Sequence, residues 1–168
     1  MAKLTKANEY GQLELNQVAF RRDGRIIAQY KLDSTIDYVE NGMLLAIDYV
    51  NKTVKMPEAN QTAGIALNYT TEHMYDERLV HGLKHFRLDN GTFLPRLGLL
   101  AAGDRFTTNT VDCDYEAVKA GLGTTNYYGH ASANGYIVVN ETATDAVLQV
   151  IEATTMPDGS KALKFVAL

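Results

Sequence analysis

Turn signals recur between short apolar stretches, and this recurrence limits the folds open to the chain more than any other feature. Pairs such as Asp23-Gly24 and Asn41-Gly42 tolerate a positive φ angle, and each stands beside a stretch of strand length. Strands predicted in this way recur about every 8–15 residues, which favours a β-barrel or a β-sandwich over alternating helices and parallel strands. The 10 Tyr and 13 Gly, against only 3 Pro, agree with strands separated by turns. The sequence therefore predicts a mainly β, single-domain fold with one or two short helices.

Two hairpins are expected in the first half of the chain. Asp23-Gly24 should join a strand within residues 13–20 to a strand within residues 26–32. The dense apolar run at residues 43–50 should turn at Asn51-Lys52 into the next short strand. We therefore expect the two strands of each pair to be neighbours in a sheet.

Two further hairpins are expected in the second half. Residues 83–97 should fold back around Asp89-Asn90-Gly91, preceded by a turn or a short helical piece at residues 72–79. Residues 145–168 should form a closing hairpin around the tight turn at residues 156–160. The C-terminal strand is apolar, so we expect it to be tied into the sheet.

Residues 112–123 are the best helix candidate in the chain. Asp112 or Asp114 can cap the first turn, and Glu116 favours the positive end of the helix dipole. Gly121 can supply a left-handed residue that ends the helix.

The stretch around Gly103-Asp104 raises the question of a reactive loop. The residues that follow, 105–111, alternate in the manner of a strand, and Asp104 is well suited to accept hydrogen bonds from the backbone nearby. We therefore interpret this stretch as a turn that begins a strand, with no reaction to perform.

The chain divides into a short segment without periodicity and one domain. Residues 1–12 show no regular pattern and are interpreted as a flexible N-terminal arm. Residues 13–168 are expected to form a single β-rich domain, because a chain of 168 residues is the usual size of one domain. No apolar run approaches the length of a membrane span, and the N-terminus carries no apolar signal segment.

Composition restricts the partners of the protein. The formal net charge of −4 disfavours a dedicated nucleic-acid binder, because such proteins present a basic face. We therefore expect neither a nucleic-acid partner nor a membrane partner. The chain has one cysteine, Cys113, so no disulfide can form within it.

No motif in the sequence indicates catalysis, a cofactor or a metal. His81 and His85 have the spacing of helical zinc ligands but lack the glutamate of hydrolytic motifs, and as strand residues they would be too far apart for one ion. The acidic run at residues 112–116 fails the EF-hand pattern. The acidic neighbours of Cys113 would raise a thiol pKa, which opposes activation as a nucleophile. We therefore expect a protein that is not an enzyme.

Residues 125–135 are interpreted as an exposed loop rich in Gly, Ser and Asn, and its most notable side chains are those of Tyr127, Tyr128 and His130. Paired tyrosines with small polar neighbours suit an interface or a site where a sugar ring stacks. An equally weighted interpretation is that one ring closes an end of the β-barrel.

Two parts of the sequence resemble a known family. Residues 40–70 resemble a segment of the head decoration proteins of tailed bacteriophages, including the lambda type. In this segment a glycine turn precedes a strand that ends in an acidic residue, a polar loop follows, and the next strand starts with Gly-Ile. Within residues 98–168, the stretch "AAGDRFTTNTV" is similar to a turn and strand of β-barrel virion proteins, and the last 34 residues resemble their late strands and C-terminal hairpin.

This resemblance implies a function without catalysis. It implies a virion protein, made in the host cytoplasm, that binds the major capsid protein on the outer capsid surface and stabilises the head, with a homotrimer favoured. The arms of such proteins order on the capsid, which would give an interface role to four residues of the N-terminal segment, Lys3, Leu4, Lys6 and Tyr10.

Three alternatives belong to other classes of function. A carbohydrate-binding or host-attachment module would use Tyr127, Tyr128 and His130. Another structural part of a phage, such as a tail or neck component, would share the β-rich composition. A hydrolase whose site is scattered along the sequence would leave no local motif.

Overall fold

The computed structural model of the protein describes residues 2–70 and 83–168. The fold is mainly β, with 39% strand and 9% helix, and its sheets are arranged as in a β-sandwich. The predicted fold class is thereby confirmed. The sheets do not close into a barrel, so of the two architectures expected from the sequence only the sandwich is consistent with the structure. The expected helical piece at residues 72–79 lies outside the described residues.

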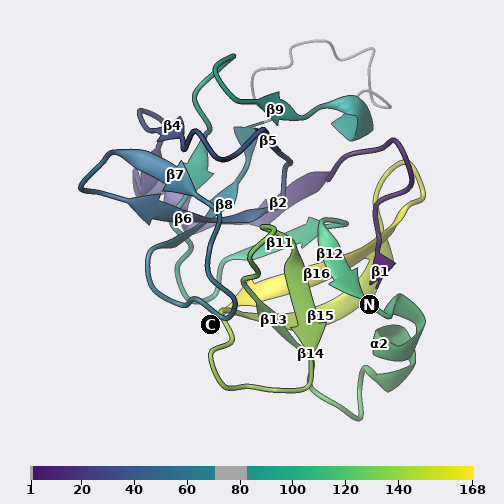
Figure 1. Ribbon diagram of the computed structural model, residues 1–168. Helices are drawn as coiled ribbons and strands as arrows, with labels where there is room; N and C mark the ends of the chain where they lie inside the picture. The colour runs from purple at the N-terminus through teal and green to yellow at the C-terminus, as the bar shows by residue number, and fades with distance from the viewer. Residues whose placement is uncertain (1, 71–82) are drawn as a thin grey trace.

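The larger sheet has eight strands and contains both ends of the described chain. All of its pairings are antiparallel except that between β12 and β14, and Figure 1 shows it in the lower part of the molecule. In sheet order the strands are β1 (Ala2–Lys3), β12 (Val111–Cys113), β14 (Ile137–Asn140), β13 (Tyr128–His130), β15 (Leu148–Thr155), β16 (Lys161–Ala167), β11 (Arg105–Thr108) and β2 (Leu13–Gln17).

The second sheet has six strands and lies above the first in Figure 1. In sheet order its strands are β3 (Ile26–Ile27), β10 (Leu97–Gly98), β8 (Ile65–Asn68), β6 (Leu44–Asp48), β7 (Thr53–Lys55) and β4 (Lys31–Leu32). A separate two-stranded sheet pairs β5 (Tyr38–Val39) with β9 (Leu88–Asp89). The helical elements that the structure describes include α1 (Ala19–Arg22), the 3-10 helix η2 (Leu83–His85) and α2 (Tyr115–Gly121).

The longer strands follow the expected relation between sequence pattern and burial. In β14, Ile137 and Val139 are buried while Val138 and Asn140 are partly exposed, so the period-two alternation separates two faces. In β6 the run from Leu44 to Ala46 is buried without interruption, because this strand is covered on both faces. Apolar burial on these strands is the main force that holds the sheets together.

Two clusters of buried side chains form the core. One includes Phe106 and Phe165 of the larger sheet, whose ring centroids lie 5.6 Å apart, and it also takes in Leu44 and Leu67 of the six-stranded sheet. The other includes Leu45, Val54 and Leu88, and it fills the smaller sheets. A polar seam lies between the two, where Thr110 donates a hydrogen bond to the carbonyl oxygen of Asn41 at 2.5 Å.

Two glycines allow the seam to close. A Cβ atom at Gly11 would collide with Thr110 Oγ1, and a Cβ atom at Gly42 would collide with Thr108 Oγ1. Gly42 also has a φ of 83°, in the region that favours glycine. The predicted turn at Asn41-Gly42 therefore also serves as a point of close approach between the two sheets.

The N-terminal segment differs from the free arm expected over residues 1–12. Ala2 and Lys3 form the edge strand β1, paired with Cys113 and Asp112, and the Leu4 amide continues this pairing by donating to the Val111 carbonyl at 3.0 Å. Further along, the Tyr10 amide donates to the Lys84 carbonyl at 2.7 Å. A two-residue strand has no alternation to detect, which is why its sequence is aperiodic.

Two of the four expected hairpins are confirmed. β6 and β7 are antiparallel neighbours joined through Asn51-Lys52, and Lys52 has a φ of 54°. β15 and β16 form the closing hairpin around the turn at residues 156–160. The expected helix at residues 112–123 is also confirmed as α2.

The other two expected hairpins are wrong. Residues around Asp23-Gly24 do not join two paired strands, because α1 precedes the turn and β3 then pairs with β10. Within residues 83–97, β9 pairs with β5 and β10 pairs with β3 and β8, so the two strands are not partners. A strong turn signal reverses the chain locally but does not decide which strand the next segment joins.

Candidate functional site

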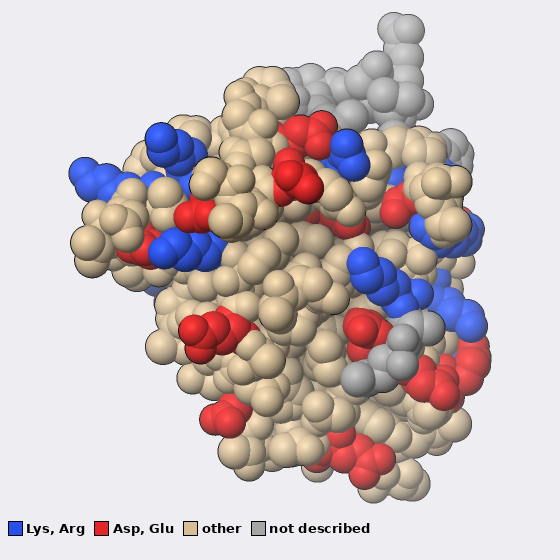
Figure 2. Space-filling model, in the orientation of Figure 1, with Lys and Arg blue, Asp and Glu red and all other residues tan. Residues whose placement is uncertain are grey.

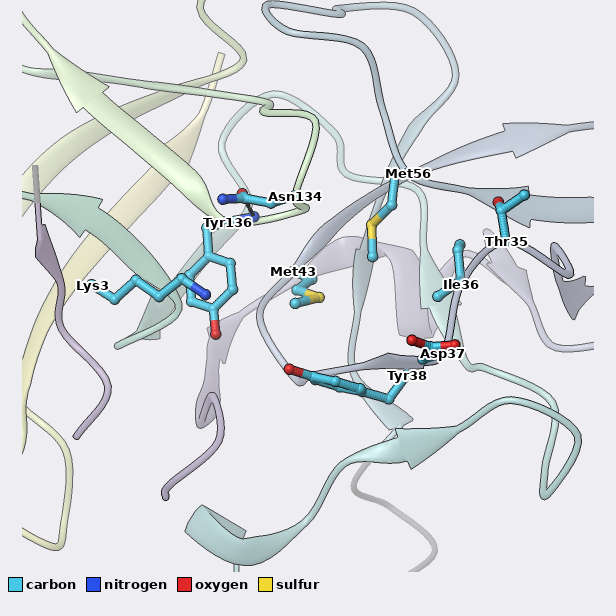
Figure 3. A pocket seen from close by; sticks show the side chains of 9 residues that line it. All are labelled: Lys3, Thr35, Ile36, Asp37, Tyr38, Met43, Met56, Asn134 and Tyr136. Carbon is cyan, nitrogen blue, oxygen red and sulfur yellow. Dashed lines mark hydrogen bonds between the residues drawn. The ribbon is translucent and has the colours of Figure 1, made fainter. Parts of the chain in front are cut away.

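A polar groove runs along the N-terminal segment, where the seam between the sheets reaches the surface. Two adjacent hollows of about 240 and 360 Å³ share Lys3, Tyr38 and Tyr136 in their walls, and we call them together the N-terminal groove. Figure 3 shows the first hollow, with Lys3 lying across the Tyr136 ring and the side chains of Met43 and Met56 facing Tyr38 and its neighbours.

The floor of the groove is a buried pair of residues, Glu40 and Tyr136. Glu40 is only 3% exposed; its carboxylate accepts one hydrogen bond from Tyr136 Oη at 2.7 Å and another from the Gly11 amide at 2.6 Å. Burial, together with the hydrogen bond to Glu40, raises the pKa of Tyr136 above its ordinary value. The phenol therefore remains a hydrogen-bond donor at neutral pH, and the pair joins the residue directly before β14 to the N-terminal segment.

The walls of the groove combine tyrosine rings with cations. Lys3 Nζ lies 3.9 Å from the centroid of the Tyr136 ring. The Arg87 guanidinium carbon lies 4.5 Å from the Tyr38 ring centroid and 5.3 Å from that of Tyr10, and these two rings meet edge to face at 5.9 Å. Such contacts hold the cations against the rings and restrict the side chains to one arrangement.

Two ion pairs also restrain charged side chains at the groove. Arg87 Nε lies 2.8 Å from a carboxylate oxygen of Asp89, and Lys84 Nζ lies 3.1 Å from Glu9 Oε1. The second carboxylate oxygen of Glu9, Oε2, is buried and has no hydrogen-bond partner in the part of the chain that the structure describes. Among residues 2–70 and 83–168, the groove thus contains an acceptor without a donor.

Three of the four N-terminal residues predicted as interface residues line this groove: Lys3, Lys6 and Tyr10. The fourth, Leu4, instead packs against the core of the larger sheet. The sequence offered no signal for Tyr38, Glu40, Arg87 or Tyr136, because residues 38–40, Arg87 and Tyr136 lie in three stretches far apart in the chain.

The predicted site at Tyr127, Tyr128 and His130 has a different environment from the exposed loop we expected. His130 is 2% exposed within β13, and its Nε2 lies 3.0 Å from the Thr142 carbonyl oxygen. Tyr127 packs against the core, and its hydroxyl occupies the space beside Gly121 at the end of α2. The expectation of an exposed histidine is therefore wrong. Because the sheets do not close into a barrel, the alternative in which a tyrosine ring closes a barrel end does not hold in that form, although Tyr127 is partly buried against the core.

Residues 128–130 form the strand β13, and Gly129 permits this because it has no side chain. A Cβ atom at Gly129 would lie 3.0 Å from side-chain atoms of both Ile137 and Leu148, so only glycine lets β14 and β15 approach at this point. The glycine that indicated a loop in the sequence is thus a point of close packing.

A second surface feature lies beside the edge strand β4. Tyr30, which precedes β4, contacts Tyr49 with ring centroids 6.3 Å apart, and Leu32 within β4 shares the wall of a hollow with Phe93. Val50 is 90% exposed and Phe93 is 68% exposed. We call the four large exposed apolar side chains around β4 the apolar tip: Tyr49, Val50, Phe93 and Leu94.

Charge is distributed unevenly over the surface. In Figure 2, Lys and Arg side chains lie in the upper part and along the right-hand border of this face, whereas the lower part carries Asp and Glu without Lys or Arg. The upper part of this face also carries Asp and Glu, so only its lower part shows charges of a single sign.

Within the described residues, no three His, Cys, Asp or Glu side chains are grouped as metal ligands would be. His81 lies outside that part of the chain, so the structure does not test whether His81 and His85, whose spacing was considered for a metal, lie close together. Burial, aided by Asp112 and Asp114, raises the pKa of the Cys113 thiol to about 12. The thiol is therefore protonated at neutral pH, as the acidic neighbours in the sequence led us to expect.

The fold and its surfaces define a β-sandwich-like protein with a polar groove at the junction of the sheets and an apolar tip at a sheet edge. Comparisons with protein-family models, with curated proteins and with solved structures found no match. No helix among residues 2–70 and 83–168 is long and apolar enough to cross a membrane. The function must therefore be inferred from the surfaces of the molecule itself.

Proposed function

We propose that this protein is a structural protein of a tailed-phage virion that attaches to the outer surface of the capsid and stabilises the head without catalysis. The observation that carries the proposal is the apolar tip, because four large exposed apolar side chains beside one edge strand are typical of a protein–protein contact. The partner is the major capsid protein, and the protein acts at the surface of the virion.

The geometry of the tip supports attachment to another protein. β4 is an edge strand of the six-stranded sheet, so its outer backbone groups are not paired within that sheet. Tyr49 and Val50 lie in the turn between β6 and β7, where Tyr49 contacts Tyr30, while Phe93 and Leu94 line a hollow together with Lys31 and Leu32 of β4. An edge flanked by apolar side chains suits a partner that adds backbone hydrogen bonds and buries those side chains together.

The phage assignment comes from the resemblance over residues 40–70 and 98–168. Residues 43–55 of that resemblance form β6, β7 and the turn that carries Tyr49 and Val50. A homotrimer is proposed on the same basis. Three copies that each make a modest contact with the capsid would resist dissociation more than the affinity of one contact implies.

Cosedimentation with purified empty, expanded capsids of the phage that encodes the protein tests this proposal. The wild-type protein should sediment with the capsids and raise their resistance to heat. Val50→Ser combined with Phe93→Ser should weaken binding by about tenfold or more, since large apolar side chains carry much of the energy of an interface. Sedimentation equilibrium of the free protein should give three times the mass of one chain.

The matched control is Ile151→Ser on β15, which removes an exposed apolar side chain of the larger sheet. This variant should bind capsids as the wild type does. Absence of wild-type binding to the capsids would overturn the proposed function. Equal loss of binding in the control and in the tip variant would overturn the role of the tip.

A further inference from the structure

We propose that the N-terminal groove is a binding site for a neutral saccharide. This inference concerns a different surface from the apolar tip and does not depend on attachment to a capsid. The groove does not include Tyr127, Tyr128 or His130, the residues of the alternative carbohydrate-binding site that the sequence suggested.

The first argument comes from the aromatic walls. The side chains of Tyr10, Tyr38 and Tyr136 all line the larger hollow. The C–H faces of a sugar ring pack against aromatic rings, and tyrosine adds a hydroxyl that can bond to the sugar. Tyr38 and Tyr136 also line the smaller hollow. Because Tyr136 is only 3% exposed and its ring is covered by Lys3, the partly exposed Tyr38 is the ring that a sugar would meet from both hollows.

The second argument comes from the hydrogen-bonding groups, which decide the charge of the ligand. Lys3 and Lys6 offer ammonium donors at the groove. Glu9 Oε2, also in its wall, is a buried acceptor without a partner in the described residues. A sugar hydroxyl can accept from a lysine and donate to the glutamate.

An anionic ligand satisfies only part of this arrangement. A phosphate dianion or a carboxylate could accept hydrogen bonds from Lys3 and Lys6. It has no proton to donate to Glu9, and the carboxylates of Glu9 and of the exposed Asp37 in the adjacent hollow would repel it. The groove therefore favours a neutral ring that carries hydroxyl groups.

The groove is also held in one arrangement before any ligand binds. Glu9 is fixed by Lys84, Arg87 is fixed by Asp89 and by two tyrosine rings, and Tyr136 is fixed by Glu40. A site whose side chains are already ordered loses less entropy on binding. The two hollows, about 240 and 360 Å³, together lie in the range of small-molecule sites.

The test is binding of the full-length protein to an array of neutral and acidic oligosaccharides, with the neutral hits measured in solution by calorimetry. We expect saturable binding of at least one neutral oligosaccharide, with a Kd of about 1 mM or tighter. Tyr38→Leu and Glu9→Gln should each weaken that binding by about tenfold, because one removes a ring and the other weakens the acceptor. Lys3→Gln, at an exposed position, provides a third variant in case Tyr38→Leu does not fold.

Tyr49→Leu is the matched control, because it removes a tyrosine ring from the apolar tip and should leave saccharide binding unchanged. The proposal is overturned if no neutral saccharide on the array binds, if only acidic saccharides or inorganic phosphate bind, or if the groove variants bind as the wild type does. Capsid cosedimentation of Lys3→Gln should remain normal, so failure of one proposal can be told from failure of the other.

Discussion

At the scale of single residues, Asp104 shows how one carboxylate can hold two distant segments together. Asp104 Oδ2 accepts a hydrogen bond from the Ala101 amide at 2.9 Å, as expected for a turn residue. Its other oxygen accepts from the Ala19 amide at 2.6 Å, at the first residue of α1. The local bond follows from the sequence, whereas the bond to Ala19 exists only because the chain brings α1 to this turn.

Asp158 performs a similar task in the closing hairpin. Its Oδ1 accepts hydrogen bonds from the Ser160 amide and hydroxyl at 2.9 and 2.7 Å, and its Oδ2 accepts from the side-chain amide of Gln12 at 3.0 Å. Burial by itself would raise the pKa of Asp158, but the hydrogen bonds from Ser160 and Gln12 outweigh it and lower the pKa to about 2.

This lowered pKa predicts a dependence of stability on pH. Because the folded pKa is below the ordinary value of 3.8, the contribution of Asp158 is complete above pH 3.8 and is lost as the pH falls through about 2. Asp158→Asn should cost about 1–2 kcal/mol at pH 7 and flatten the acid dependence between pH 4 and 2, as measured by urea unfolding. The exposed Glu58→Gln serves as the control, and an unchanged acid limb in Asp158→Asn would contradict this account.

At the scale of elements, α2 illustrates a structure that local chemistry specifies almost completely. Asp114 is the N-cap, and its side chain accepts from the Ala117 amide at 3.2 Å, while Glu116 and Lys119 stand at the ends that favour their charges. The helix ends at Gly121, but the glycine with positive φ is Gly123, so the left-handed residue lies two positions later than expected.

Removal of the cap is therefore expected to destabilise this element. Asp114→Ala leaves the Ala117 amide without its side-chain acceptor and should lower the free energy of unfolding by about 1 kcal/mol. Lys119→Ala, at an exposed position on the same helix, is the control and should change stability by less than half as much. Urea denaturation monitored by circular dichroism measures the stability of both variants. Equal losses of stability in Asp114→Ala and Lys119→Ala would argue against a capping role for Asp114.

Strand length decides which sheet elements the sequence reveals. β15 and β16, of 8 and 7 residues, show enough alternation to be predicted with their connecting turn. β1, β3 and β10 have 2 residues each, which is too few for a period to appear. Their places in the sheets are set by neighbours far along the chain.

At the scale of the whole molecule, the N-terminal segment belongs to the junction between the two sheets. β1 extends the larger sheet, Leu4 packs on its core, and the Gly11 amide donates to the buried Glu40. The segment therefore contributes contacts that a free arm would lack.

Deletion of residues 1–9 should consequently destabilise the protein. Loss of β1, of the packing of Leu4 and of the Glu9–Lys84 ion pair should remove about 2–3 kcal/mol, because partly buried apolar surface becomes exposed. The melting temperature should fall by about 4–10 °C. An unchanged melting temperature in differential scanning calorimetry would mean that the segment is a free arm in solution.

The sequence alone determined the mainly β class, the β6–β7 and β15–β16 hairpins, α2 with its cap, and the turn at Asp104, because each depends on residues within about one turn or one hairpin of one another. The resemblance also implied an interface role for Lys3, Leu4, Lys6 and Tyr10, which stays a prediction, and three of these residues, Lys3, Lys6 and Tyr10, line the N-terminal groove. Only the tertiary structure decided that these three residues meet Tyr38, Arg87 and the buried Glu40–Tyr136 pair in one groove. Contacts between residues so far apart depend on how the sheets pack, and no local pattern of side chains encodes that packing.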